Sequence, residues 1–143
     1  MSTKLNSIKY LAIIVLALLV SCGKLKGEFA IKNAMDDNYR RITRSLEFAR
    51  EDEIQWAYIF QNNKIRHKIG VIILKKELVW VEVTSYTSII DINNNIVHGT
   101  IKDYPPGDYQ IVLTDVENNN FIEKKDFLIY SRAEDRAGME NYR

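Results

Sequence analysis

Large apolar residues alternate with polar residues along most of the chain after residue 53. In residues 54–60 every second side chain is large and apolar, which is the period of a half-buried β-strand. Segments with this pattern, or with a continuous apolar run, follow at residues 64–74, 78–86, 89–92, 96–101, 109–114 and 121–130. Turn-forming residues such as asparagine, proline and glycine separate several of them. Six or seven short strands of this kind predict a β-sandwich or a barrel.

The segment before residue 53 has a different period. Its apolar residues are spaced by three or four positions, which gathers them on one side of a helix. The set is Ile31, Met35, Tyr39, Ile42, Leu46 and Ala49. Asp36 and Asp37 suit the N-terminal half of such a helix electrostatically. The pattern therefore predicts one amphipathic α-helix over residues 30–52, in front of a sandwich at residues 53–130 and a charged, flexible tail at residues 131–143.

The first twenty residues show a third pattern. Lys4 and Lys9 precede an uncharged apolar run over residues 10–20, and the small residue Ser21 follows it. This order is typical of an export signal. The run is short for a membrane-spanning helix, which needs ~20 apolar residues. Cys22, the single cysteine of the chain, comes directly after Ser21.

The segment Leu19-Val20-Ser21-Cys22 resembles the lipobox of bacterial lipoproteins. The resemblance implies that residues 1–21 are a lipoprotein signal peptide, that the Cys22 thiol carries a diacylglycerol, and that residues 22–29 tether the fold to lipid. An ordinary export signal with an incidental cysteine is the alternative. Since the only cysteine is assigned to lipid, no intrachain disulfide is expected, and core packing must stabilise the fold.

The same resemblance bears on location. In enteric lipoproteins an aspartate after the cysteine retains the protein in the inner membrane, whereas this chain has Gly23 at that position. We therefore expect a bacterial cell envelope location, anchored in the outer membrane, on its surface or its periplasmic face. The abundance of lysine, asparagine and isoleucine resembles lipoproteins of the spirochaete type.

One stretch suggests the kind of sandwich. Residues 103–115, Asp-Tyr-Pro-Pro-Gly-Asp-Tyr-Gln-Ile-Val-Leu-Thr-Asp, resemble the penultimate strand of immunoglobulin-like domains. The resemblance implies that Tyr109 is a corner tyrosine bonded to nearby backbone, that Ile111 occupies the place of the second cysteine, and that Trp80 is the core tryptophan. The expected fold is mainly β, an immunoglobulin-like antiparallel sandwich after one helix. A meander or barrel with a Pro-Gly turn is the alternative.

The sequence offers few residues for catalysis. His67 and His98 have no metal-site spacing, and we expect both on the surface. Residues 91–95 begin like a calcium loop, but Ile96 and Lys102 stand where glycine and glutamate are needed. An asparagine-rich hairpin turn is the better interpretation there, and again at residues 118–120.

Charge and motifs narrow the function. Removal of residues 1–21 takes away two lysines and no acid, which leaves nearly balanced charge and argues against a nucleic-acid partner. No nucleophile-elbow, zincin or phosphate-loop motif occurs. We expect a non-enzymatic lipoprotein without cofactor, held at the membrane through Cys22, that binds or adheres to another protein through strand edges and asparagine loops. An accessory factor of an envelope complex, facing the periplasm, is the alternative.

Overall fold

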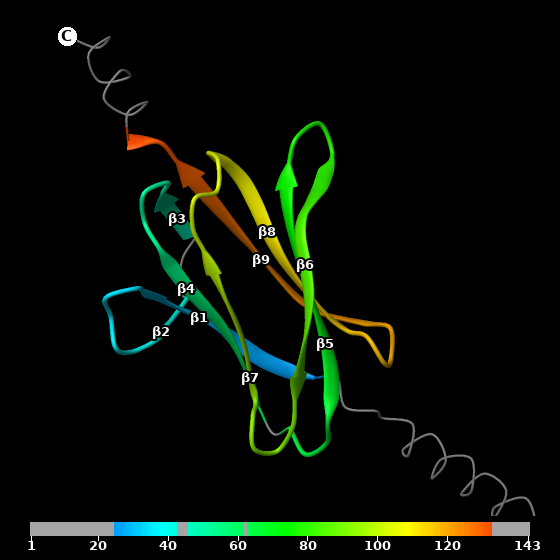
Figure 1. Cartoon of the computed structure of the whole chain (residues 1–143). Helices are drawn as coiled ribbons and strands as arrows, with labels where there is room; N and C mark the ends of the chain where they lie inside the picture. The colour runs from blue at the N-terminus through cyan, green and yellow to red at the C-terminus, as the bar shows by residue number, and fades with distance from the viewer. Residues whose placement is uncertain (1–24, 43–45, 62, 133–143) are drawn as a thin grey trace, which may run out of the picture.

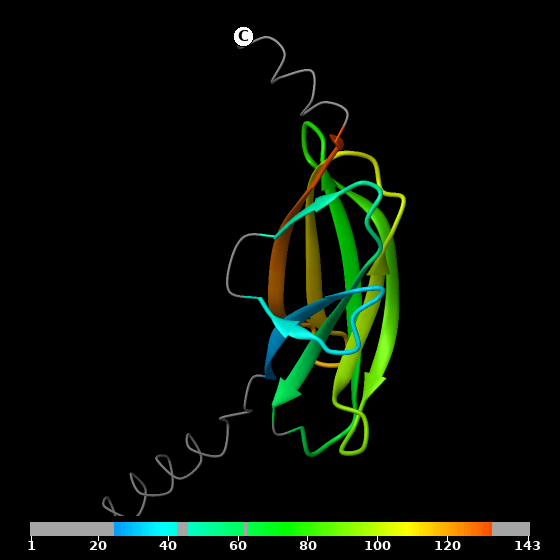
Figure 2. The same ribbon diagram turned by 90° about the vertical axis from the view of Figure 1, so that its left-hand side faces the viewer.

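The computed structural model describes residues 25–42, 46–61 and 63–132, which form nine β-strands in two layers (Figures 1 and 2). The first sheet has the order β2-β1-β4-β7, with β1 at Lys26–Asn33, β2 at Arg40–Arg41, β4 at Ile54–Gln61 and β7 at Ile96–Ile101. The second has the order β3-β9-β8-β5-β6, with β3 at Leu46–Ala49, β5 at His67–Lys76, β6 at Trp80–Ile90, β8 at Gly107–Asp115 and β9 at Asn120–Tyr130. The fold is mainly β and forms a sandwich.

The pairings are antiparallel with one exception among the described strands. β3 runs parallel to β9, so that Leu46 lies beside Phe127 and Ala49 beside Tyr130. β5 is an interior strand of the second sheet, with β8 on one side and the edge strand β6 on the other. No helix in the described ranges is long and apolar enough to cross a membrane.

The core lies between the sheets and follows from the alternation in the sequence. The inward positions of β4 and β8 are almost completely buried, as are those in the first part of β5. In the first sheet the rings of Phe29, Tyr58 and Phe60 pack edge to face at centroid separations of 4.8 Å. Removing such a side chain from water contributes about 1.5–3 kcal/mol. The inward side chains of the alternating segments are therefore the side chains that form the core.

The predicted helix over residues 30–52 is wrong. Residues 30–33 belong to β1, which pairs with β4 along its whole length, and residues 46–49 form β3. Met35, a member of the expected apolar side, is fully exposed in the turn that follows β1. The spacing of three and four positions joined residues that face the core from separate strands, so tertiary pairing explains the pattern better than a helix does.

This correction moves the domain boundary. The sandwich begins at Lys26 rather than at residue 53, and part of the expected tether, residues 26–29, lies in β1. Residues 43–45 of the expected helix lie outside the described residues. So do the signal segment, Cys22 and residues 133–143 of the expected tail.

Two aromatic predictions have opposite outcomes. Tyr109 is buried, its hydroxyl donates a hydrogen bond to the carbonyl of Pro105 at 2.7 Å, and its ring stacks on Phe127. The predicted corner tyrosine is thus confirmed. Trp80 is not the core tryptophan, since 42% of it is exposed, whereas Trp56 is 1% exposed. The physical reason is position in the sheet: Trp80 begins the edge strand β6, and Trp56 lies in the interior strand β4.

Candidate protein-binding edge

Strand β6 lies at the free edge of the five-stranded sheet. It pairs with β5 on one side, and no strand of the described chain pairs with it on the other (Figure 1). It is eleven residues long, and nine of the eleven are exposed, the exceptions being Ser88 and Ile90. An edge of this kind presents unpaired backbone N–H and C=O groups to any extended chain that approaches.

The exposed apolar side chains of the protein gather at this edge. Seven of the thirteen large hydrophobic residues that are exposed in the described ranges lie between residues 78 and 89. They are Leu78, Val79, Trp80, Val81, Val83, Tyr86 and Ile89. Glu82 is the one charged residue of β6, and the strand contains neither lysine nor proline. Edge strands often carry such residues to prevent pairing; β6 lacks both, although its register with β5 shifts by one residue at Val83.

The other edges of the two sheets differ from β6. β2 has two residues, both arginine, and β3 has four. β7 has six residues and is partly covered, because the Tyr86 hydroxyl reaches across from β6 and donates a hydrogen bond to the carbonyl of His98 at 3.0 Å. Burial raises the pKa of Tyr86 to about 12. Among the described strands, β6 is the longest edge strand.

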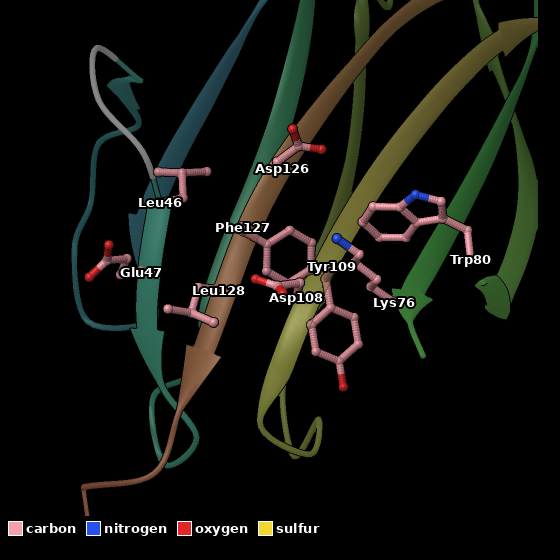
Figure 3. A pocket seen from close by; sticks show the side chains of 9 residues that line it. All are labelled: Leu46, Glu47, Lys76, Trp80, Asp108, Tyr109, Asp126, Phe127 and Leu128. Atoms are coloured by element: carbon pink, nitrogen blue, oxygen red, sulfur yellow. The ribbon is translucent and has the colours of Figure 1, made fainter. Parts of the chain in front are cut away.

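A hollow of about 400 Å³ lies next to the start of β6. Trp80 and Lys76 bound one side and Glu47 lies on the opposite side, as Figure 3 shows. Asp108 and Asp126 also line it, and the Gln110 amide holds Asp126 at 2.6 Å. Three carboxylates and one amine make the hollow acidic.

The prediction of a surface position for His67 is wrong. His67 is buried, and its Nδ1 lies 3.2 Å from Oδ2 of Asp115. It shares the inward face of β5 with Ile69 and Val71, so the alternation of that strand contained the signal for its burial. His98 lies exposed on β7, as predicted.

Asp115 is the centre of a polar cluster at the end of β8. Burial alone would raise its pKa, but hydrogen bonds from the side chain and backbone of Asn118, together with His67, outweigh burial and hold the pKa below its usual range. Glu117 brings a third candidate metal ligand within 4.8 Å of His67 and Asp115. Because Asp115 already accepts these bonds, we assign the cluster to fastening the β8–β9 turn against β5.

Both asparagine loops are turns, but only the one between β8 and β9, which pair antiparallel, is the predicted hairpin. In the β6–β7 connection Oδ1 of Asp91 accepts the backbone N–H groups of Asn93 and Asn94 at 2.8 and 3.0 Å, as an Asx turn does. The carboxylate therefore closes a turn rather than a calcium loop. The predicted hairpin is wrong at this position, because the turn carries the chain from β6 in one sheet to β7 in the other. In the β8–β9 connection Asn119 adopts a positive φ of 50°, a conformation that asparagine tolerates.

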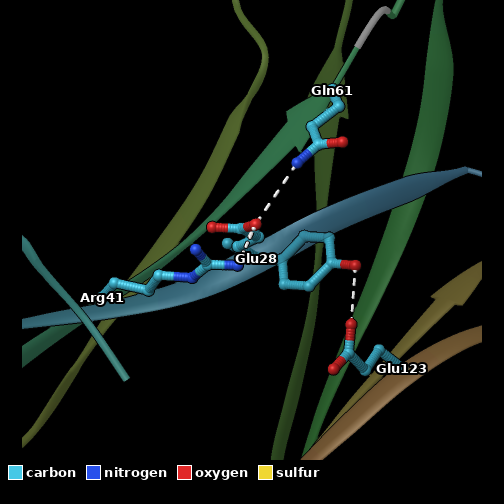
Figure 4. A network of polar contacts seen from close by, with 5 residues as sticks. Glu28, Arg41, Gln61 and Glu123 are labelled. Carbon is cyan, nitrogen blue, oxygen red and sulfur yellow. Dashed lines mark hydrogen bonds and ion pairs between the residues drawn. The ribbon is translucent and has the colours of Figure 1, made fainter. Parts of the chain in front are cut away.

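A second polar network joins the two sheets (Figure 4). The Tyr58 hydroxyl of β4 donates to Glu123 of β9 at 2.9 Å, and burial raises the pKa of Tyr58 far above its usual value. On the neighbouring strands Glu28 accepts hydrogen bonds from Arg41 and Gln61. These contacts tie β2 to β1 and the first sheet to the second, so the polar groups are occupied in holding the sandwich together.

Comparison with known proteins shows the fold but no family. No protein-family model matches the sequence, and no curated protein matches it. Among solved structures, the chain is similar to the PmoD soluble domain from Methylocystis sp. ATCC 49242 (Rockwell), with 9% sequence identity and a TM-score of 0.50. The match covers 77% of this chain and 99% of that one. At this identity the likeness indicates a shared sandwich architecture alone.

Proposed function

We propose that this protein is a non-catalytic bacterial lipoprotein, anchored in the envelope through Cys22, that binds another protein chain along β6. The observation that carries the binding role is the long, apolar and nearly uncharged edge of the second sheet. The lipobox at Leu19–Cys22 supports the anchor. Together they describe a small sandwich held at a membrane with one edge free to receive a partner.

Strand addition is the binding mode that fits such an edge. An extended segment of the partner would pair with the free backbone groups of β6 and extend the sheet. Each cross-strand pair of side chains contributes roughly 0.2–1 kcal/mol. Val81, Val83 and Ile89 would lose exposed apolar surface on binding, while the acidic hollow beside Trp80 would hold a basic partner residue.

We further propose that the sandwich has an immunoglobulin-like topology. An immunoglobulin-like topology is supported by the division of strands, since β4 and β7 share one sheet while β5, β8 and β9 share the other. The bond from Tyr109 to Pro105 at the start of β8 is the expected corner. The buried side chain of Ile111 fills the place where antibody domains carry a cysteine. In that topology β5 corresponds to the third strand of an immunoglobulin domain. β6 then corresponds to the extra strand that variable-type domains carry beside it.

The anchor is tested by replacing the cysteine. Cys22→Ser should give an unprocessed precursor that takes up no labelled fatty acid, because no thiol is left to carry the diacylglycerol. Ser21→Ala, which keeps a small residue before the cut, should be processed and labelled like the wild-type protein. Normal maturation of Cys22→Ser, seen as the same electrophoretic mobility and the same label, would contradict the anchor.

The binding edge is tested by cross-linking in cells. A photo-reactive amino acid at Val83 of β6 should capture a protein, whereas the same group at Phe121, an exposed residue of β9, should capture little. Equal capture at both positions would reject β6 as the site. Protease added to intact cells then separates the two envelope faces: digestion indicates a surface-exposed binding protein, and protection favours the periplasmic accessory role.

A further inference from the structure

The end of the sandwich where β5 begins and β8 ends brings one histidine and two carboxylates together. We propose that His67, Asp115 and Glu117 bind a zinc ion at this end. Each side chain has one atom able to coordinate a metal, and these three atoms all lie within 4.8 Å of one another. His67 begins β5, whereas Asp115 ends β8 and Glu117 lies in the turn after it, so only folding brings the three together. The inference is independent of the proposed binding role of β6.

The distance between His67 and Asp115 matches that between two ligands of one zinc ion. Nδ1 of His67 lies 3.2 Å from Oδ2 of Asp115. This distance is at the upper end of the range for an N–H···O hydrogen bond, about 2.7–3.2 Å. Zinc ligands lie about 2.0–2.2 Å from the ion in a tetrahedral arrangement, which places neighbouring ligand atoms about 3.3 Å apart. The pair therefore has the spacing of one edge of a zinc tetrahedron.

Two of the three ligands are buried and held by paired backbone. The exposed fraction of the side chain is 11% for His67 and 5% for Asp115. The backbone N–H of Val116 donates to the carbonyl of Lys68 at 2.9 Å, which fastens the chain beside Asp115 to the strand that carries His67. Ligands on such rigid elements need little ordering when the ion binds.

The hydrogen bonds of Asp115 are compatible with a bound ion. A carboxylate offers about four acceptor positions. Asn118 occupies two of them, with its backbone N–H on Oδ1 at 3.2 Å and its side-chain amide on Oδ2 at 2.8 Å. Zinc would take the place of the proton between His67 and Asp115, and the imidazole would then carry its proton on Nε2. The Asn118 bonds would remain and orient the carboxylate. Without an ion, the same contacts fasten the β8–β9 turn against β5.

Glu117 supplies the third ligand from the solvent side. Its side chain is exposed in the turn between β8 and β9, so its carboxylate is free to rotate toward an ion. Two carboxylates and a neutral imidazole balance the charge of a divalent cation. Imidazole is a ligand of zinc, whereas calcium and magnesium take oxygen ligands. The fourth tetrahedral position is left for water, as in zinc sites with three protein ligands.

Equilibrium dialysis of the detergent-solubilised full-length protein, followed by metal analysis, tests the site. The wild-type chain should retain zinc in the presence of excess magnesium. Glu117→Gln and His67→Gln should each weaken zinc binding about ten-fold or more. His98→Gln removes the exposed histidine of β7 and is the matched control, which should bind zinc like wild type. Cys22 is present in every variant, so any contribution from it is constant.

Chemical unfolding provides a second readout. An ion that binds only the folded chain stabilises it by mass action, so zinc should raise the denaturant midpoint of wild type and of His98→Gln. It should raise the midpoint of Glu117→Gln much less. Because Glu117 is exposed, this variant keeps the test decisive even if His67→Gln, at a buried position, fails to fold. Wild-type zinc binding by Glu117→Gln, or an equal loss of binding in His98→Gln, would overturn the site.

Discussion

Strands β6 and β8 both flank β5, pair with it in antiparallel fashion and have similar lengths, yet they differ in almost every other respect. β8 lies between β5 and β9, and its inward residues Tyr109, Ile111 and Leu113 are buried. The corresponding inward residues of β6 include Thr84 and Tyr86, which are exposed. Buried packing is therefore concentrated on one side of β5 and exposed apolar surface on the other.

The difference follows from what faces each strand. β8 is covered by the first sheet, so its inward side chains contribute packing energy in proportion to the apolar area removed from water. β6 is exposed on both faces over most of its length. Its apolar residues therefore contribute little to the free energy of folding. Their apolar surface would be removed from water only if a partner covered it. A substitution should thus affect folding in β8 and association in β6.

The largest expected effect on folding is in β8. Leu113→Ala should lower the free energy of unfolding by about 2–5 kcal/mol, because it leaves a cavity at a fully buried site. Urea-induced unfolding measures the change. Val83→Ala in β6 is the control and should stay within about 1 kcal/mol. Similar losses at both positions would mean that the two strands do not differ as described.

Tyr109→Phe should cost about 0.5–1.5 kcal/mol, because the partly buried hydrogen bond to the carbonyl of Pro105 is lost while the ring packing on Phe127 is kept. Tyr104→Phe, a half-buried neighbour whose ring packs 5.4 Å from that of Tyr109, serves as the matched removal of one oxygen and should change the unfolding free energy by about 0.5 kcal/mol or less. A Tyr109→Phe protein as stable as wild type would remove the corner from the account of β8.

A smaller effect concerns the seam between β8 and β5 and depends on pH. The folded-state pKa of Asp115 is held below its unfolded value, so its carboxylate contributes stability that is complete above the unfolded pKa. That contribution should be lost as the pH falls below about 4, through the folded pKa. Unfolding free energies measured from pH 7 down to acid should therefore fall more steeply for wild type than for Asp115→Asn. Parallel curves would contradict the assignment.

The smallest effect on folding is expected in β6. Val81→Thr keeps the shape of an exposed strand residue and should change the unfolding free energy of the monomer by about 0.5 kcal/mol or less. It should nevertheless weaken association, because the buried interface would then contain a hydroxyl. Val71→Thr in β5 gives the contrast, since the same hydroxyl placed in the core should destabilise the fold measurably. Unfolding curves, together with photo-cross-linking from Val83 in the same variants, separate the two effects.

Four strands could be predicted from the sequence, because the alternation of side chains within each strand shows which of its faces is buried. β4, β7, β8 and β9 alternate apolar and polar residues, and each predicted segment matches its strand to within a few residues. β1 was not predictable in this way: few of its residues are buried, and its partner β4 determines its conformation. The period of three and four was accidental, because Ile31 and Leu46 reach the core from different strands.

The candidate site was predictable in kind but not in place. Strand edges were expected to bind a partner, and the low charge of residues 80–90 is visible in the sequence. Which strand lies at an edge depends on the order of strands in the sheet, a tertiary property. For the same reason the sequence assigned the core tryptophan to Trp80 instead of Trp56, since both lie in strands rich in aromatic and branched residues.

The parallel pairing of β3 with β9 has a consequence for the order in which the protein can be made. Leu46, near the start of the fold, finds its neighbour Phe127 only when nearly all of the chain has been synthesised. Folds with such distant pairings form slowly, in milliseconds to seconds rather than microseconds. The unfinished chain therefore cannot complete its second sheet during synthesis. The chain stays incompletely folded until its last strand arrives, which would suit the export that we propose for it.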